Sequence, residues 1–325
     1  MTIRTPLCDM LGIKYPIMLA GMGGVSYGEL AAAVSEAGGF GCLGMAGRSL
    51  DDIKREMKIT RDNTDKPFGV DLLAAVPESL ERAADIIIEG GAKAFISGLG
   101  VPPPHLIKKF HDAGLKVMNV NGAVKHAKSA ERGGLDAVVA QGTEAGGHTG
   151  RIAGMALIPQ IVDAVKIPVI AAGSIVDGRG LAAALALGAQ GVWMGTRFIA
   201  STEAHAGGLY KQVIVDAGDE DTIITRSYSG KPMRVFKNEW TADWESRPQD
   251  IKPFPQQSMM SSQAGVMGGI GGQIEGLDIK SSAFAMGQGA GAIHEVKPSR
   301  EIIAEIMEQA EAVIAKMAAL AKAHA

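Results

Sequence analysis

The stretch Asp136-Ala-Val-Val-Ala-Gln-Gly-Thr-Glu-Ala-Gly-Gly-His148-Thr-Gly-Arg151 decides how the chain is interpreted. Residues 136–140 form a short apolar run that predicts a buried strand, and a glycine-rich loop follows directly. Glycines let such a loop turn tightly and approach a flat ligand, because no Cβ stands in the way. The loop also carries Gln141, Glu144 and His148. Polar residues on a loop after a buried strand are typical of α/β active sites, although a surface turn with an incidental histidine fits the same letters.

Similar apolar runs recur along the chain, and each is followed by a loop and a helical segment. They are continuous rather than alternating, which is typical of parallel strands that are buried on both faces. About eight strand–loop–helix units in succession favour a closed TIM (β/α)8 barrel, with a doubly wound open sheet as the alternative. The expected strands are residues 15–20, 40–44, 67–73, 93–97, 115–120, 136–140, 168–172 and 190–194.

Three polar residues stand where helices are expected to begin. Ser26, Ser49 and Asp177 each precede a helical segment, and such side chains accept hydrogen bonds from the free N–H groups of a first turn. We therefore expect Ser26 and Asp177 to act as helix caps, and a helix to begin within residues 49–52.

The regular alternation ends after Thr196. We expect residues 1–200 to form the barrel core. Residues 201–292, which contain prolines and aromatic residues, are expected to form a largely helical and irregular insertion that covers the barrel mouth. Residues 293–325 should end in an amphipathic helix that packs back on the barrel, with Ser299 as its N-cap.

Composition narrows the class of protein. The chain has 325 residues, is 46% hydrophobic and contains 43 glycines, which suits a large α/β core. Its net charge of −3 gives no reason to expect nucleic acid or an anionic membrane as a partner. Cys8 and Cys42 have no metal-ligand spacing, so no metal site is expected. The N-terminus lacks an apolar signal segment and no window is long enough to span a membrane, so a cytoplasmic location is expected.

The loops after the last two expected strands carry small and hydroxylated residues. In barrels of this kind, those two loops often bind a phosphate group through backbone N–H groups. Gly173 and Ser174 follow one strand, and Gly195 and Thr196 follow the other. We expect these four residues to form a phosphate cradle, with the two hydroxyls as additional donors.

Two further glycine-rich segments could approach a ligand closely. Gly21, Met22 and Gly23 follow the first expected strand, and a polarizable Met among glycines suits the face of a flat ring system. The late run 285–291, which includes Gln288, is either another such loop or a flexible surface loop.

Six motifs in order resemble the nitronate monooxygenase (2-nitropropane dioxygenase-like) family of FMN-dependent barrel enzymes. Enoyl-thioester reductases and NADH:quinone reductases that depend on FMN carry similar motifs. The motifs are Ala20-Gly-Met-Gly-Gly24, Phe68-Gly-Val-Asp71, Gln141-Gly-Thr-Glu-Ala-Gly-Gly-His148, Ala172-Gly-Ser174, Gly178-Arg-Gly180 and Met194-Gly-Thr-Arg-Phe198.

The resemblance implies FMN as cofactor and His148 as the catalytic general acid/base. A histidine titrates near neutral pH, so it can remove a proton from a weakly acidic C–H group or return one. Asp71 departs from the pattern, because many relatives carry Asn there. The residues expected to hold FMN are Gly21, Met22, Gly23, Asp71, Gln141, Gly146, Gly147, Gly173, Ser174, Gly195, Thr196 and Gln288.

We therefore predict a nitronate monooxygenase-type enzyme that oxidises a nitronate or nitroalkane with dioxygen. One alternative is an NAD(P)H-dependent flavin reductase of an enoyl thioester (CoA- or ACP-linked) or a quinone. The other is a barrel that binds a phosphorylated metabolite without redox chemistry. The expected partners are a small-molecule substrate and, for the reductase, NAD(P)H; homo-oligomers are possible.

Overall fold

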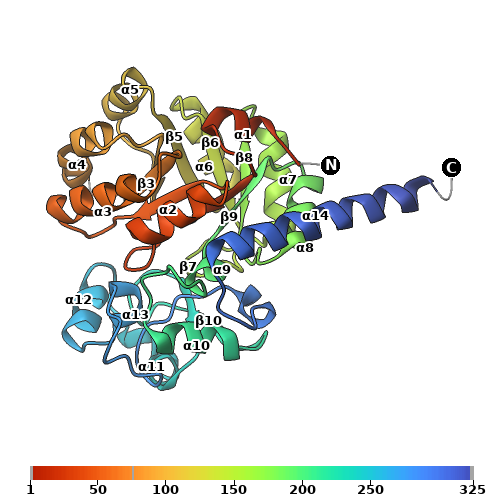
Figure 1. The fold of residues 1–325 in the computed structure, drawn as a ribbon. Helices are drawn as coiled ribbons and strands as arrows, with labels where there is room; N and C mark the ends of the chain where they lie inside the picture. The colour runs from red at the N-terminus through yellow and green to blue at the C-terminus, as the bar shows by residue number, and fades with distance from the viewer. Residues whose placement is uncertain (1–2, 75–76, 323–325) are drawn as a thin grey trace.

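The computed structural model describes residues 3–74 and 77–322, and its centre is a barrel of parallel strands (Figure 1). The strands lie in the order β1-β9-β8-β6-β5-β4-β3-β2. The barrel closes between β1 and β2, where Leu19 N–H donates to Phe40 O and Phe40 N–H donates to Ile17 O, each over 2.9 Å. This closure confirms the predicted TIM barrel over the open sheet. The barrel strands are β1 Ile17–Leu19, β2 Gly41–Gly44, β3 Phe68–Leu73, β4 Ala94–Gly98, β5 Lys116–Asn121, β6 Ala137–Gln141, β8 Val169–Ala172 and β9 Gly191–Met194.

Helices surround the barrel, and both faces of its strands are buried. One apolar cluster fills the interior and includes Met18, Phe40 and Ile96, while a second lies between strands and helices. Helix α1 contributes Leu7 and Leu11 to the interior cluster. Burial on both faces explains why the strands appear as continuous apolar runs. The helices are α1 Pro6–Leu11, α2 Gly28–Glu36, α3 Leu50–Asn63, α4 Pro77–Glu89, α5 Pro104–Asp112, α6 Val124–Arg132, α7 Gly154–Ala164 and α8 Gly178–Ala186.

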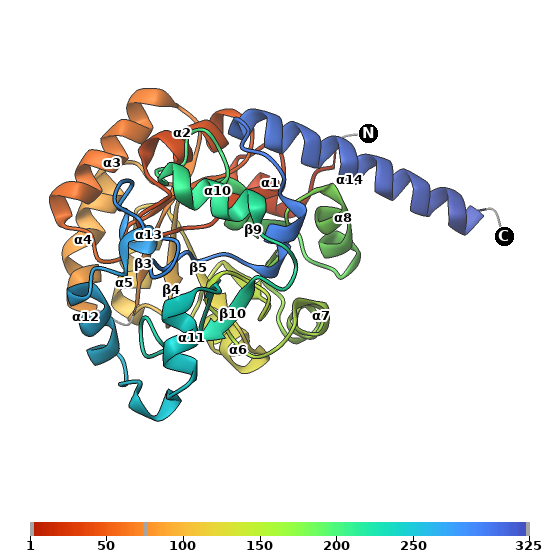
Figure 2. The ribbon, with the colours of Figure 1, turned by 90° about the horizontal axis from the view of Figure 1, so that it is seen from below.

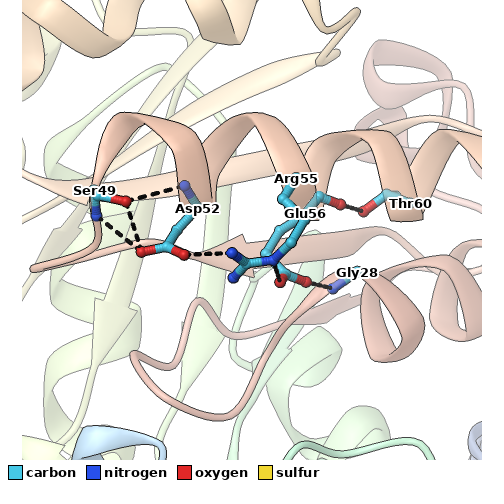
Figure 3. Close-up of polar contacts among 6 residues, drawn as sticks. All are labelled: Gly28, Ser49, Asp52, Arg55, Glu56 and Thr60. Carbon is cyan, nitrogen blue, oxygen red and sulfur yellow. Dashed lines mark hydrogen bonds and ion pairs between the residues drawn. The ribbon is translucent and has the colours of Figure 1, made fainter.

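Helix α3 shows how a cap and a buried carboxylate join neighbouring helices (Figure 3). The Ser49 hydroxyl accepts the Asp52 N–H over 3.1 Å, and the Asp52 carboxylate accepts from Ser49 in return. One turn later the Glu56 carboxylate accepts the Gly28 N–H, the first residue of α2, over 2.9 Å. The helix therefore begins where the sequence predicts one, with Ser49 as its cap, and Glu56 joins α3 to α2.

The two expected caps have opposite outcomes. Asp177 accepts from the N–H groups of Arg179 and Gly180, so it caps α8 as predicted. The prediction for Ser26 is wrong, because the residue before α2 is Tyr27, which makes no side-chain cap. The Ser26 hydroxyl is turned the other way and accepts the Met22 N–H over 2.7 Å. It therefore supports the loop after β1 instead of the helix.

The segment after the barrel lies across one end of it, as Figure 2 shows. Its order is α9 Thr196–Ile199, α10 Gly208–Asp216, β10 Thr222–Thr225, β11 Met233–Phe236, α11 Glu239–Glu245, η1 Pro248–Asp250, α12 Gln256–Gln263, α13 Gly268–Gly271 and η2 Gln288–Ala292. The expectation of a largely helical insertion missed a three-stranded antiparallel sheet, β10-β11-β7. Strand β7 is Gly147–His148, so this sheet joins the covering segment to the loop after β6.

The last helix, α14 Ser299–Lys322, runs along the outside of the barrel and extends beyond it (Figures 1 and 2). It packs closely on the start of α8, where Gly178 N–H donates to the Gln309 side chain over 3.0 Å. Ser299 is the first residue of the helix rather than a residue before it, and its hydroxyl donates to Glu203. The division of the chain at residues 200 and 292 stays a prediction.

Candidate active site

A cavity of about 1070 Å³ lies at the carboxyl ends of the barrel strands, between the barrel and the covering segment. Pockets that bind small molecules typically enclose roughly 300–1,000 Å³, so this one is at the upper end of that range. It brings together every predicted site residue except Gln288. The predicted residues that line it are Gly21, Met22, Gly23, Asp71, Gln141, Gly146, Gly147, His148, Gly173, Ser174, Gly195 and Thr196.

Gln288 does not belong to the cavity wall. Its side chain is exposed, and its backbone N–H donates to Glu144 O over 3.0 Å. The neighbouring Gly289 lines the cavity instead. The late glycine run therefore reaches the site as predicted for a close-approach loop, but through its backbone and not through the amide side chain of Gln288.

The loop after β1 supplies one wall. Met22 is held by Ser26 and by close packing on β2, since a Cβ on Gly44 would lie 2.4 Å from Met22 backbone atoms. The Met22 sulfur also lies near the loop after β9, because a Cβ on Gly195 would be 3.2 Å from it. The thioether is therefore placed between the first and the last strand of the barrel.

The loops after β8 and β9 form a second wall with free backbone donors. In the described part of the chain, the N–H groups of Gly173, Ser174, Gly195 and Thr196 make no hydrogen bond. Ser174 has a φ of 51°, a left-handed conformation that is uncommon outside glycine. Four unpaired N–H groups at one edge of a cavity are the donors that an anion requires.

The two hydroxyls of this wall are used differently than expected. The Ser174 hydroxyl donates to Glu144 O over 2.9 Å and accepts from Gly289 N–H over 2.9 Å. Its proton is therefore not available to a ligand. The Thr196 hydroxyl accepts from Gly287 N–H over 3.0 Å and keeps its own proton for another acceptor. The late glycine run is therefore tied to both loops.

His148 lies in β7 and faces the cavity. Gly147 precedes it with a φ of 71°, and Gln141 donates from its side chain to His148 O over 2.7 Å. The imidazole Nε2 lies 3.0 Å from the Ser229 hydroxyl. Burial, and secondarily the charge of Lys231, lowers the pKa of His148 below its usual value. The ring is therefore neutral at pH 7 and can accept a proton.

Sequence analysis missed Ser229 and Lys231. Both belong to the turn before β11, 81 and more positions after His148, and no local motif marks them. Pairing of Met233 with His148 across β11 and β7 brings that turn to the cavity. The Ser229 hydroxyl is 3.1 Å from Lys231 O, to which it donates, and 3.3 Å from Lys231 N–H, from which it accepts.

Asp71 lies in the inward-facing row of β3, two residues before Leu73, and is 9% exposed. Its carboxyl group lies beside Gly21, where an added Cβ would come within 2.5 Å of Oδ2. Burial raises the pKa of Asp71 well above its usual range. The sulfur of Cys42 lies in the same interior, and burial, with the nearby Asp71, raises the pKa of that thiol.

Neither a metal-binding group of side chains nor a membrane-spanning helix is found among the residues that the structure describes. No group of three or more His, Cys, Asp or Glu side chains is placed to hold a metal ion. No helix within residues 3–74 and 77–322 has the length and apolar character needed to cross a membrane.

Comparison with known proteins assigns the family. The nitronate monooxygenase family model matches residues 4–309. A probable nitronate monooxygenase of Staphylococcus saprophyticus is 34% identical over 307 residues, which cover 81% of this chain and 86% of that protein. A Mycobacterium tuberculosis (3aS,4S,5R,7aS)-5-hydroxy-7a-methyl-1-oxo-octahydro-1H-indene-4-carboxyl-CoA dehydrogenase is 40% identical over 249 residues, covering 76% of this chain and 70% of that protein.

Among solved structures, FabK from Thermotoga maritima is similar over 98% of this chain and 100% of its own, with 37% identity and a TM-score of 0.90. The match therefore includes the covering segment and the last helix as well as the barrel. With the family model spanning nearly the whole chain, the protein belongs to the nitronate monooxygenase family and is an FMN-dependent oxidoreductase.

Proposed function

We propose that FMN occupies the inner part of the cavity, with its phosphate at the loops after β8 and β9 and its ring system toward Met22. The unpaired N–H groups of Gly173, Ser174, Gly195 and Thr196 support the phosphate position. The polarizable Met22 sulfur and the open surface of Gly23 suit the face of a flat ring. When bound, FMN supplies the redox chemistry, and the protein supplies position and electrostatics.

We propose further that the enzyme oxidises a nitronate or nitroalkane with dioxygen, and that His148 moves the proton. The single observation that carries this role is the His148 imidazole at the cavity wall, with Nε2 3.0 Å from the Ser229 hydroxyl. The only proton of the Ser229 hydroxyl is directed to Lys231 O. The remaining contact is satisfied when His148 Nε2–H donates to Ser229, which leaves Nδ1 as the base.

The proposed reaction requires a base because a nitroalkane is a carbon acid. A neutral imidazole takes the proton from the carbon next to the nitro group, and the product nitronate is the electron-rich form that is oxidised. Once Nδ1 has taken up this proton, it can return the proton later in the cycle. Gln141 holds the backbone of His148 over 2.7 Å, which limits movement of the ring during both transfers.

An anaerobic mixing experiment tests this function. The purified protein, reconstituted with FMN, is mixed without oxygen with a short nitronate, and the flavin absorbance is followed. Rapid bleaching, with recovery when oxygen is admitted, is the expected result. No bleaching by any nitronate, together with rapid bleaching by NADH or NADPH, would overturn it.

The second candidate is an NAD(P)H-dependent reductase of an enoyl thioester or a quinone. Two observations favour it: the cavity of about 1070 Å³ is at the upper end of the range for small-molecule pockets, and a 40% identical relative is named for a CoA thioester substrate. Lys231 lines the same cavity and could attract a phosphorylated carrier. The anaerobic mixing experiment described above separates the two candidates. The assigned family of oxidoreductases excludes the non-redox alternative.

A further inference from the structure

Asp71 is a buried carboxyl group that faces the cavity without a partner. It lies on the inward side of β3 between Gly21 and Gly98, which both line the cavity. Its backbone is fixed, because Asp71 O accepts the Met45 N–H over 3.0 Å. Among the residues that the structure describes, none forms a hydrogen bond or an ion pair with the Asp71 carboxyl oxygens.

No positive charge compensates this group. The basic residues that share the cavity, His126, His148 and Lys231, make no ion pair with it in the described part of the chain, and the Tyr210 phenol, which also lines the cavity, carries no positive charge. Beneath it, Cys42 is a neutral thiol, since burial raises its pKa. A carboxylate that is buried and unpaired is costly, so such a group takes up a proton instead. The depth of burial raises the pKa of Asp71 well above its usual range, in agreement with this argument.

We propose that Asp71 keeps its proton at neutral pH and donates it in a hydrogen bond to the bound flavin. The proposal rests on the proposed FMN site. A protonated carboxyl group carries one O–H donor and one carbonyl acceptor, the same pair that an Asn amide presents. A carboxylic acid kept neutral by an apolar site can serve as a hydrogen-bond donor in this way.

The proposal resolves the departure that the sequence shows at this position. An ionised Asp71 would place a negative charge next to the flavin and disfavour its reduced anionic form. A protonated Asp71 adds no charge and presents the same donor and acceptor pair as an Asn side chain. The substitution of Asn by Asp is then neutral for the cofactor at pH 7, and it becomes harmful only when the carboxyl group ionises.

Infrared difference spectroscopy reads the protonation state directly. Spectra of the protein at pH 7, wild type minus Asp71→Asn, are expected to contain the C=O band of a protonated carboxyl group and no carboxylate bands. Asp136→Asn is the matched control. Burial raises the Asp136 pKa, but hydrogen bonds from Val117 N–H, Lys116 and His111 outweigh it and leave the pKa lowered. Its difference spectrum should contain carboxylate bands only. Carboxylate bands for Asp71 would overturn the proposal.

Affinity for FMN tests the hydrogen bond itself. A hydrogen bond contributes about 0.5–1.5 kcal/mol, so Asp71→Ala should raise the Kd for FMN about 3- to 10-fold while Asp71→Asn leaves it within about twofold at pH 7. At alkaline pH the wild type alone should lose affinity. An Asp71→Ala variant that binds as tightly as wild type would overturn the proposal.

The infrared and affinity experiments distinguish a failure of the Asp71 proposal from a failure of the proposed function. If the wild type binds no FMN, both the proposed function and the hydrogen bond to flavin are wrong, while the infrared spectrum of the apoprotein still decides whether Asp71 is protonated. If FMN binds and nitronates do not react, only the proposed reaction is wrong, and the Asp71 results stand.

Discussion

Removal of the Ser229 hydroxyl tests whether it positions the catalytic imidazole. Ser229 is 3% exposed, and its Oγ lies 3.0 Å from His148 Nε2. The variant Ser229→Ala removes this contact and leaves the side of the ring that faces the cavity unchanged. The imidazole should then rotate between orientations, of which only one directs Nδ1 at the substrate.

The size of the effect follows from a single neutral hydrogen bond. Such a bond contributes about 0.5–1.5 kcal/mol, and about 1.4 kcal/mol corresponds to a tenfold change in rate, so we expect kcat to fall about 3- to 10-fold. KM should change little, because Ser229 holds the base and not the substrate. The measurement is stopped-flow reduction of the flavin by a saturating neutral nitroalkane, whose proton the base must remove, or by the substrate that the anaerobic mixing experiment identifies.

Ser227→Ala is the matched control for Ser229→Ala. Ser227 lies two residues away and is fully buried, and its hydroxyl has no partner among the described residues. Its loss should leave kcat unchanged. In a His148→Ala background, Ser229→Ala should have no further effect, since the two residues act as one unit. An unchanged kcat in Ser229→Ala, or an equal loss in both serine variants, would refute the reasoning.

Four further predictions concern the same cavity. His148→Ala should retain the flavin spectrum and lose about 100- to 10,000-fold in turnover, because the base is gone; unchanged turnover in a steady-state assay would rule out its role. Gly195→Asp should raise the Kd for FMN more than about tenfold, since it adds a negative charge to the loop whose N–H groups are proposed to bind the phosphate. The neutral Gly195→Asn should change the Kd less; equal values by fluorescence titration would argue against the phosphate cradle. Lys231→Gln removes a positive charge that lowers the pKa of His148, so this pKa should rise in the variant. The acid limb of the kcat/KM profile should then move to higher pH, and a shift to lower pH would contradict the assigned cause. Asp71 has a raised pKa in the folded state, so its contribution to stability is full below about pH 4 and is lost as pH rises through that pKa. Asp71→Asn should therefore melt at a higher temperature than wild type at pH 8 and at the same temperature below about pH 4; a constant difference in differential scanning calorimetry would show that ionisation is not involved.

The sequence alone was enough to predict the barrel and most of the residues at its mouth. Continuous apolar runs such as 168–172 identify strands buried on both faces, and this local pattern repeats often enough to close a barrel. The carboxyl ends of parallel strands must meet at one rim, so glycines after β1, β8 and β9 were bound to converge. The same reasoning correctly brought His148 to that rim.

Tertiary structure alone decided which groups surround these residues. The Ser229–His148 contact depends on antiparallel pairing between segments 81 positions apart, and no periodicity in either segment encodes that register. Ser26 precedes a helix as a cap would, but its hydroxyl is engaged by Met22 N–H. The raised pKa of Asp71 comes from its burial in the folded protein, and the sequence around residue 71 does not reveal that burial. Sequence patterns specify which backbone edges meet, whereas side-chain partners and pKa values follow from distances that only the packed chain defines.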